Sequence, residues 1–414
     1  MTKLGWRAAV VAASVGVLIV ISCRSTSNAQ EQSSLAVKCS ASGNISLDDR
    51  IAGCTALIET TSTAKQTVTV ALFRRALFYT QKRELELAIA DYDQIIDHDP
   101  NNLVARIRRA FTYAQKKEMD AALADYEKVV ELDPKNVEAY LGRAGVYLAK
   151  GDIDQAIDDY SRALQIHPEN VSAYLGRSRA YGRKDESDRA IADCNRVIEI
   201  SPNGDFGYLC RGEAYRDRND LDRALADFER AVQLNPKDPR AHLDVASVHQ
   251  RRDNAELALP SLDEALQLDP NNAGLYFSRG VVRLGVNMLP GAIEDFNRSS
   301  ELNSKSLYTR LWLEIARKRS GQPGQLADSV GKLDMEKWPA PLIHLFLGDE
   351  TLETVLVAVG KKKGLVCEAN FYAGELALTQ GAPEEAIRLL HLAADGCPRT
   401  FVEWLAAAGI KLRG

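Results

Sequence analysis

The chain has 414 residues, of which 45% are hydrophobic and 26% are charged, and only 14 are prolines. This composition is typical of an ordinary soluble helical protein. The formal net charge of −5 argues against a general nucleic-acid binder, because such a protein needs an excess of basic side chains to neutralise phosphates.

Residues 1–29 have the pattern of an export signal. Lys3 and Arg7 precede an apolar run from Ala8 to Ile21, and a run of 14 residues is short for a membrane-spanning helix. The pattern therefore predicts that the chain leaves the cytoplasm.

Three fates of this segment remain open. The stretch Val20-Ile21-Ser22-Cys23 resembles a bacterial lipobox, which implies acylation of Cys23 as the new N-terminus. Ser27-Asn28-Ala29 is instead a small-x-small site for release of a soluble product, and an uncleaved anchor is the third alternative. Cleavage predicts a periplasmic protein, held at the outer membrane through a lipid on Cys23 or otherwise secreted.

A pattern of 34 residues recurs from residue 69 to residue 306 and is clearest in Val137–Asn170. Small and aromatic residues recur there at helical spacing on both sides of Gly151, and the pattern ends near Pro168. This predicts two amphipathic helices joined by a tight turn. Such a hairpin is apolar on two sides, so it buries both only by stacking on copies of itself.

Three positions keep this register along the chain. The proline that ends the second helix recurs as Pro100, Pro134, Pro168, Pro202, Pro236 and Pro270, before Ser304. The alanine after the turn recurs as Ala88, Ala122, Ala156, Ala190, Ala224, Ala258 and Ala292. The first-helix tyrosine recurs as Tyr79, Tyr113, Tyr147, Tyr181 and Tyr215, followed by His249 and Arg283.

This period and these positions resemble the tetratricopeptide repeat, or TPR. The resemblance implies an all-α TPR solenoid, a superhelix of antiparallel helix hairpins, with seven repeats in residues 69–306. Residues 30–68 then form an N-terminal linker and a half-repeat cap, and a helical C-terminal extension follows the array.

Two charged positions of the repeat change together. Position seven is Arg75, Arg109, Arg143, Arg177, Arg211, Val245 and Arg279, and position twenty-three is Asp91, Asp125, Asp159, Asp193, Asp227, Ser261 and Asp295. The single repeat without the arginine also lacks the aspartate. Because an unpaired charge between helices is costly, we predict a structural ion pair inside each hairpin, such as Arg143 with Asp159 and Arg177 with Asp193. Independent change at two surface positions is the alternative.

The sixth repeat is irregular. His242 and His249 replace its usual core aromatics, and Pro260 lies inside its second helix. No third ligand accompanies the two histidines, so we predict packing and no metal site. Pro260 is expected to shift the start of the helix or to bend it.

Two further parts follow the seven repeats. Residues 307–366 are predicted to form an irregular helical segment, with helices at Leu307–Ser320, near Leu342–Leu347 and at Thr351–Val359. Residues 367–414 are predicted to form a TPR-like repeat and a C-terminal capping helix from Thr400 to Leu412.

The C-terminal part carries a second resemblance, through Leu311-Trp312-Leu313, the segment around Trp338, Phe346-Leu347-Gly348-Asp349 and Asn370-Phe371-Tyr372-Ala373-Gly374. These stretches look like the C-terminal half of envelope lipoproteins of the new lipoprotein I type. That resemblance implies a non-enzymatic adaptor that brings cell-wall hydrolases and a protease together, and some members are homodimers. This chain has more repeats and a cysteine pair in the tail, so the resemblance leaves open whether the partners are the same.

Six cysteines follow Cys23 and form three local pairs, and an even count in an exported chain predicts disulfides. We expect Cys39 to hold the half-repeat cap through Cys54, and Cys367 to meet Cys397 at the outer ends of two antiparallel helices. Cys194 and Cys210 occupy core positions of adjacent repeats, where buried thiols and a disulfide remain equally open.

No pattern of an active site is present in the sequence. It has no Gly-rich phosphate loop, no metal-ligand cluster and no nucleophile with an adjacent base, and its six histidines are scattered. We therefore predict that the protein is not an enzyme and needs no cofactor or metal.

The repeat resemblance instead predicts a binding surface, because first helices line the concave face of such solenoids. The expected partner-binding residues are apolar at the start of the array and basic in its middle: Phe73, Ile107, Phe111, Arg179, Arg183, Arg216 and Arg251. Such a surface suits a peptide or helix with apolar anchors and acidic groups. Packing between neighbouring helices is the alternative for the position-five residues, which include Phe73 and Ile107.

Two functions therefore remain open. The first is an adaptor of the bacterial cell envelope for protein or peptide partners, with cell-wall hydrolases or proteases as candidates. The second is a structural or assembly component of an outer-membrane or polysaccharide-export complex that acts by self-association.

Overall fold

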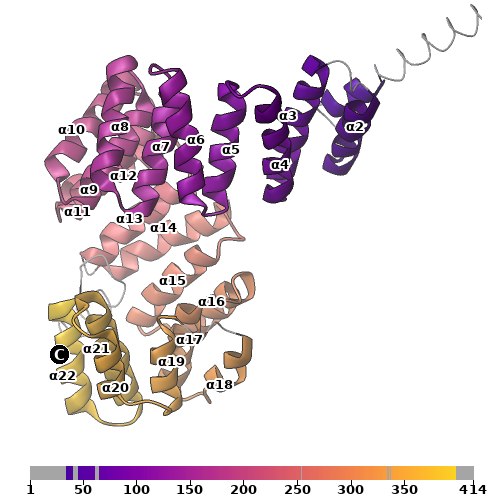
Figure 1. Cartoon of the computed structure of the whole chain (residues 1–414). Coiled ribbons are helices and arrows are strands. Elements are labelled where there is room, and N and C mark those ends of the chain that lie inside the picture. The colour runs from indigo at the N-terminus through magenta and orange to yellow at the C-terminus, as the bar shows by residue number, and fades with distance from the viewer. Residues whose placement is uncertain are drawn as a thin grey trace, which may run out of the picture. The chain divides into compact units, whose positions relative to one another are not determined.

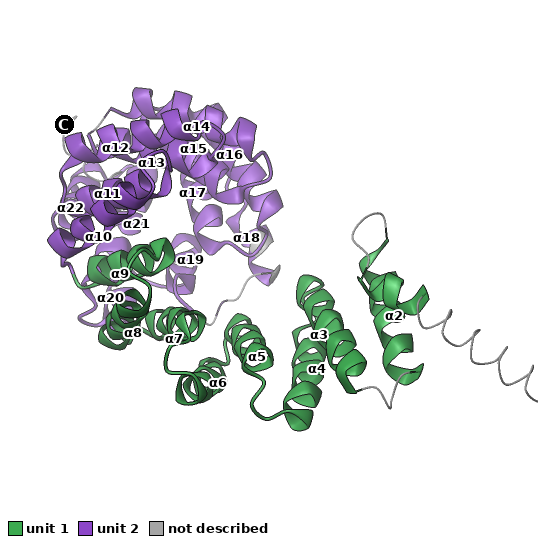
Figure 2. Cartoon of the chain, turned by 90° about the horizontal axis from the view of Figure 1, so that it is seen from above, with its two compact units in different colours: residues 1–184 green, residues 185–414 purple. Residues whose placement is uncertain are grey.

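The computed structural model describes residues 34–40, 45–60, 65–252, 254–332, 335 and 337–397. The predicted export signal with Cys23 and the predicted capping helix at 400–412 lie outside the described residues. The chain divides into two compact units, residues 1–184 and 185–414 (Figure 2). This boundary falls inside the array of seven repeats that the sequence predicts, between the two helices of the fourth repeat.

The first unit consists of helices throughout its described residues (Figure 1). Its long helices are α2 (Leu47–Thr60), α3 (Lys65–Gln81), α4 (Leu85–His98), α5 (Leu103–Gln115), α6 (Met119–Leu132), α7 (Val137–Lys150), α8 (Ile153–Ile166) and α9 (Val171–Arg183). Residues 34–40 are also helical.

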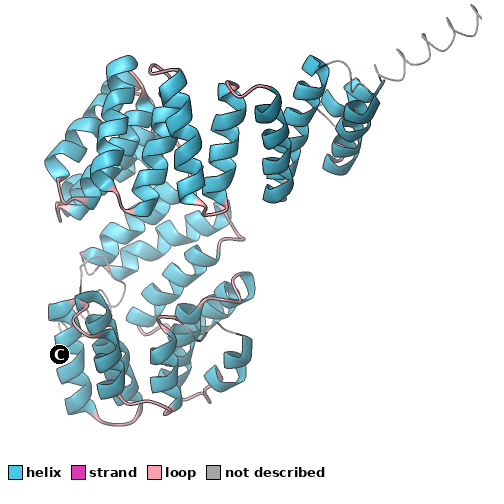
Figure 3. Cartoon of the chain, viewed as in Figure 1, coloured by secondary structure: helices cyan, strands magenta, loops and turns pink. Residues whose placement is uncertain are grey.

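The described residues of the second unit continue the pattern of paired helices (Figure 3). They form α10 (Ser187–Ile200), α11 (Phe206–Asp217), α12 (Leu221–Leu234), α13 (Pro239–Arg251), α14 (Ala255–Leu268), α15 (Ala273–Gly285) and α16 (Leu289–Leu302). The C-terminal extension then contains α17 (Leu307–Arg319), α18 (Leu326–Ser329), the 3₁₀ helix η1 (Val330–Lys332), α19 (Ala340–Leu347), α20 (Leu352–Val359), α21 (Lys363–Thr379) and α22 (Pro383–Gly396). The all-α solenoid fold that the sequence predicts is therefore confirmed for the described residues.

Local sequence explains where the first helix of a hairpin begins and ends. The side chain of Asn136 accepts a hydrogen bond from the backbone N–H of Ala139 at 3.0 Å, which caps the start of α7. The first helix ends at a residue in the left-handed region, Gly151 at φ 92° in this hairpin. Glycine adopts this conformation without the steric cost that other residues bear, and Arg83 and Lys117 bear that cost at the equivalent turns.

Small residues bring the helices of the stack close together. Ala144 and Ala156 are fully buried in one hydrophobic cluster of the α7–α8 hairpin. Gly142 faces the preceding hairpin, where a Cβ atom would lie only 2.4 Å from Cζ of Tyr126. The missing side chain at Gly142 therefore makes the space that the Tyr126 ring occupies.

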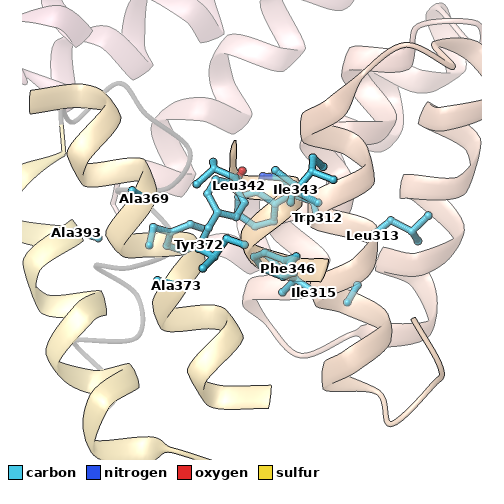
Figure 4. Close-up of a cluster of buried hydrophobic side chains, with 14 of the residues drawn as sticks. Trp312, Leu313, Ile315, Leu342, Ile343, Phe346, Ala369, Tyr372, Ala373 and Ala393 are labelled. Carbon is cyan, nitrogen blue, oxygen red and sulfur yellow. The ribbon is translucent and has the colours of Figure 1, made fainter. Parts of the chain in front are cut away.

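The C-terminal extension shares one hydrophobic core with the seventh repeat, around Trp312 (Figure 4). The Trp312 ring lies 5.4 Å from that of Phe371 and 6.3 Å from that of Tyr372, between centroids, and Phe346 packs at 6.3 Å on Tyr372. These aromatic contacts join α17, α19 and α21. The extension is therefore folded around residues that the sequence separates by about sixty positions.

Three acidic side chains, Glu314, Glu368 and Glu375, are buried in this extension, and the last two bind side chains of other segments. Glu368 accepts hydrogen bonds from the hydroxyl of Tyr308 and from Nε1 of Trp338, both at 2.8 Å. Glu375 receives two hydrogen bonds from the guanidinium of Arg319, at 2.5 and 3.0 Å. These polar contacts link α17 and the segment before α19 to α21.

Pro260 leaves the position of its helix unchanged. α14 runs from Ala255 to Leu268 with Pro260 at its sixth position, and it begins at the same register as the second helices of the other repeats. None of the helices in the described ranges is both long and apolar enough to cross a membrane.

Candidate protein-interaction surface

The predicted arginines and aspartates lie together between the helices of single hairpins. Nη2 of Arg143 lies 2.7 Å from Oδ1 of Asp159, and Nε lies 2.8 Å from Oδ2. The same paired contact joins Arg75 to Asp91, Arg109 to Asp125, Arg211 to Asp227 and Arg279 to Asp295. The aspartate side chains are almost fully buried, so each ion pair is mostly shielded from water.

Most of these arginines also hold the preceding hairpin, which the sequence pattern did not indicate. In four hairpins the second contact falls 16 residues before the arginine: Arg109 to Asp93 at 2.6 Å, Arg177 to Ser161 at 2.9 Å, Arg211 to Asn195 at 2.8 Å and Arg279 to Asp263 at 2.5 Å. Arg75 instead reaches Thr55, 20 residues earlier, at 2.9 Å. In the four hairpins the partner is an aspartate, a serine or an asparagine, so no single residue type marks this position in the sequence. The arginine therefore joins two consecutive repeats.

Arg177 and Asp193 belong to different units, so their predicted pairing stays a prediction. Within the first unit, Arg177 contacts Ser161, and its guanidinium lies 5.8 Å from the ring centroids of Tyr174 and Tyr181. Asp193 is buried within the second unit.

The sixth repeat replaces the missing pair by a different one. Nη1 of Arg216 lies 2.6 Å from Oδ1 of Asp244, and the same atom reaches Oγ of Ser247 at 3.2 Å. Burial raises the pKa of Asp244, although the charge of Arg216 opposes that shift. Val245 occupies the vacated arginine position in a hydrophobic cluster of the fifth and sixth repeats.

The three predicted apolar contact residues differ in exposure. Phe111 is 50% exposed, whereas Phe73 is half-buried with its ring 5.9 Å from that of Tyr92. Ile107 is only 5% exposed and packs in a core cluster with Ala110. The assignment of Ile107 to partner binding is therefore corrected to helix packing, because its position faces the neighbouring hairpin.

Three of the four predicted basic residues contact the protein itself. The guanidinium of Arg183 donates to the backbone carbonyl of Leu148, and Arg251 donates to that of Arg216 at 2.8 Å. Each of these two arginines lies at the end of the first helix of its repeat. Each donates a hydrogen bond to the last turn of the first helix in the preceding repeat. Arg216 pairs with Asp244, and Arg179 is exposed. Arg179 and Arg183 lie in the first unit and the other two in the second, so a common groove of all four stays a prediction.

The exposed surface of the first helices in unit 1 follows positions two and nine of the repeat. We name this surface the first-helix stripe, and it consists of Val70, Leu77, Val104, Phe111, Glu138, Gly145, Ser172 and Arg179. Residues seven apart lie on one face of a helix. All members are exposed except Leu77, which is half-buried. A Cβ atom added at Gly145 would meet no atom within 4 Å, so the middle of the stripe is open.

The structure joins all three cysteine pairs by disulfides. The bonds link Cys39 to Cys54, Cys194 to Cys210 and Cys367 to Cys397. The middle pair, for which the sequence left two alternatives, connects α10 to α11. The other two are the pairs that the sequence predicts.

No group of three or more His, Cys, Asp or Glu side chains that could hold a metal ion occurs among the residues placed by the structure. Neither histidine of the sixth repeat therefore belongs to a group of possible metal ligands among the described residues. Nε2 of His242 contacts the carbonyl oxygen of Pro236 at 3.0 Å, and burial lowers the pKa of His249.

Sequence models of the tetratricopeptide repeat match residues 70–102, 109–170, 147–205 and 212–273. The hairpins are tetratricopeptide repeats. A TPR protein from Parabacteroides merdae has a similar structure with a TM-score of 0.51 and 18% identity, covering 60% of this chain and 98% of its own. This likeness shows the shared fold.

Shorter TPR structures match parts of the chain. The TPR protein YrrB, whose structure shows an unusual peptide-binding site, has 24% identity and a TM-score of 0.34, covering 43% of this chain and 92% of its own. The MamA protein has 25% identity and a TM-score of 0.37, covering 42% and 94%. The search of curated protein sequences gives no match.

Proposed function

We propose that this TPR protein is a non-enzymatic adaptor of the bacterial cell envelope that binds a peptide segment of partner proteins on the first-helix stripe. The observation that carries the proposal is the exposure of Phe111 and Val104 on one face of α5, at 50% and 55%. Two large apolar side chains on one helix face supply area that a partner can bury.

The chemistry of the stripe defines the partner segment. Apolar side chains on α3 and α5 are followed by the open position Gly145 on α7 and by the exposed Arg179 on α9. A segment that crosses these helices would place apolar anchors near Phe111 and an acidic group near Arg179. Arginine suits this role because its planar guanidinium binds carboxylates in two parallel hydrogen bonds.

The envelope location rests on the sequence and on the cysteines. Residues 1–29 have the pattern of an export signal, and three disulfides are typical of proteins in oxidising compartments. The resemblance of the C-terminal part to envelope lipoproteins also supports this location. We propose a periplasmic protein, either anchored to a membrane through acylated Cys23 or released after Ala29.

Photo-crosslinking in the producing bacterium tests the proposed surface. A photoreactive phenylalanine analogue replaces Phe111, and a matched analogue replaces Leu87, which is 47% exposed on the second helix α4 of the same unit. We expect a discrete protein adduct from position 111 and none from position 87. No adduct at position 111, or the same adducts at both positions, would refute the stripe.

Charge reversal refines this experiment. We expect Arg179→Glu to remove the adduct at position 111, whereas Arg162→Glu, an exposed arginine of α8, should leave it unchanged. Adducts with twice the mass of the chain would instead favour the second function, assembly by self-association. Peptide sequencing of the adduct then identifies the cell-wall enzyme or other partner.

A further inference from the structure

The arginine at position seven is absent at the end of the array. The helix α17 begins at Leu307 in the same register, which places Leu313 where each regular repeat has its arginine. Sixteen residues earlier lies Asn297, at the position that holds Asp93, Asn195 or Asp263 in earlier hairpins. Asn297 therefore faces a site from which the joining arginine is missing.

A cavity of about 220 Å³ lies at this place in the second unit. Its lining includes Asn297 of α16, Arg310, Leu313 and Arg317 of α17, and Gln325 and Asp328 beyond that helix. Arg310 and Arg317 lie one turn on either side of Leu313, so both long side chains flank the vacated position. Figure 4 shows Leu313 on the side of α17 away from Tyr372, so the cavity lies outside the aromatic core.

Two acidic residues, Glu314 and Asp328, line the cavity beside the two arginines in the part of the chain that the structure describes. Neither guanidinium forms an ion pair there, and Nε of Arg317 is buried without a hydrogen-bond partner. A buried donor without a partner is unfavourable, so a ligand that supplies an acceptor removes that cost on binding.

The acidic residues at the cavity do not neutralise these arginines. Oε2 of Glu314 accepts hydrogen bonds from the backbone N–H groups of Gln325 at 2.9 Å and Leu326 at 3.1 Å, which fixes the segment after α17. Oε1 of Glu314 faces Lys318 at 3.8 Å. Asp328 is exposed at the rim.

We propose that this cavity binds a carboxylate of a peptide, through the guanidinium groups of Arg310 and Arg317. In the regular repeats an aspartate of the same chain pairs with the arginine, whereas neither Arg310 nor Arg317 pairs with an acid among the described residues, so a carboxylate of a ligand can take that role. The carboxylate belongs either to an acidic side chain or to the C-terminus of the peptide. This site is separate from the first-helix stripe, so its failure would leave the proposed function intact.

Nuclear magnetic resonance of the full chain tests the site directly. The Nε–Hε signal of Arg317 is identified by its loss in Arg317→Gln, and three unlabelled peptides are titrated. They are acetyl-Gly-Glu-amide with a side-chain carboxylate, acetyl-Gly-Gly with a terminal carboxylate, and acetyl-Gly-Gln-amide with none. We expect one or both carboxylate peptides to shift this signal, with at least about tenfold tighter binding than the glutamine peptide.

Matched variants separate the site from general charge attraction. Binding of the carboxylate peptide, followed by other signals of α17, should weaken about tenfold in Arg310→Gln and in Arg317→Gln. It should stay within about twofold in Arg298→Gln, which removes an exposed arginine of α16 that pairs with Glu301. Asp328→Asn should strengthen binding, because it removes a negative charge at the rim.

Three results would overturn the proposal. The first is an Arg317 signal that stays fixed with both carboxylate peptides at millimolar concentration. The second is equal binding of the glutamine peptide, which would show that the carboxylate is not recognised. The third is an equal loss of binding in Arg298→Gln and Arg317→Gln, which would assign the effect to overall charge.

Discussion

Arg143 and Asp159 form two parallel hydrogen bonds, 2.7 and 2.8 Å long, across the helices α7 and α8 of one hairpin. The pair is mostly shielded from water, with side-chain exposures of 17% and 9%. Its geometry is that of the strongest arginine–carboxylate pairs, and the same geometry recurs in five hairpins of the described chain.

We expect Arg143→Leu or Asp159→Leu alone to lower the free energy of unfolding by about 2 kcal/mol, because each leaves one charge without its partner. The double variant should cost less than the sum of the two single variants. Denaturant unfolding of all four proteins measures this difference. Strict additivity would show that the two side chains act independently. The exposed pair of Lys150 and Asp120, 2.6 Å apart, provides a control cycle with a much smaller coupling.

Two glycines of the same helix should respond to alanine in opposite directions. In Gly142→Ala the new Cβ would lie 2.4 Å from the Tyr126 ring, so we expect a loss of about 1–3 kcal/mol. In Gly145→Ala the new Cβ meets open space, and the higher helix propensity of alanine should add up to about 1 kcal/mol. Thermal unfolding compares the two, and equal effects would contradict the close packing at Gly142.

Stability at alkaline pH should depend on buried tyrosines. Burial raises the pKa of Tyr92 and of Tyr126 to about 12, against about 10 in an unfolded chain. Between these values the unfolded state loses the phenol proton first, so the contribution of the two tyrosines to the free energy of unfolding should be constant up to about pH 10 and fall towards pH 12. Unfolding measured across this range should show the slope, and Tyr92→Phe should reduce it. An unchanged slope would assign the pH dependence to other groups.

Processing of the N-terminus tests the envelope location. Mass spectrometry of the protein from its own bacterium should show loss of at least the first 22 residues. A lipid on Cys23 is expected for the anchored form, and Gln30 as first residue for the released form. Cys23→Ser should abolish membrane association in the first case and leave it unchanged in the second. An intact N-terminus in the cytoplasmic fraction would refute both.

Much of the fold could be predicted because each hairpin repeats the same small and aromatic residues. The 34-residue spacing of Ala122, Ala156 and their equivalents predicts the paired helices of the array. The co-variation of Val245 with Ser261 pointed to a contact between positions seven and twenty-three. Because these signals are periodic, the repeats of a single chain can be compared with one another.

The remaining features depend on side-chain packing, for which the repeats contain no periodic sequence signal. Where an arginine makes a second contact, its partner is an aspartate, serine, asparagine or threonine, so no single residue type marks that position in the sequence. Ile107 was expected at a partner-binding surface because it is apolar at position five, yet its side chain fills the space between hairpins. The cavity beside Leu313 follows from a missing arginine, and only the structure shows which side chains surround that vacancy.

An arginine that contacts both its own hairpin and the preceding one also affects how the number of repeats can change in evolution. If residues 103–136 were deleted, Arg143 would take the place of Arg109, with Asp159 ahead of it and Asp93 behind it. Both partners would again be carboxylates at the spacings that Arg109 uses. Loss or duplication of a whole 34-residue segment can therefore preserve the arginine contacts between consecutive repeats. The number of repeats can then vary in evolution without new contacts of this kind having to arise.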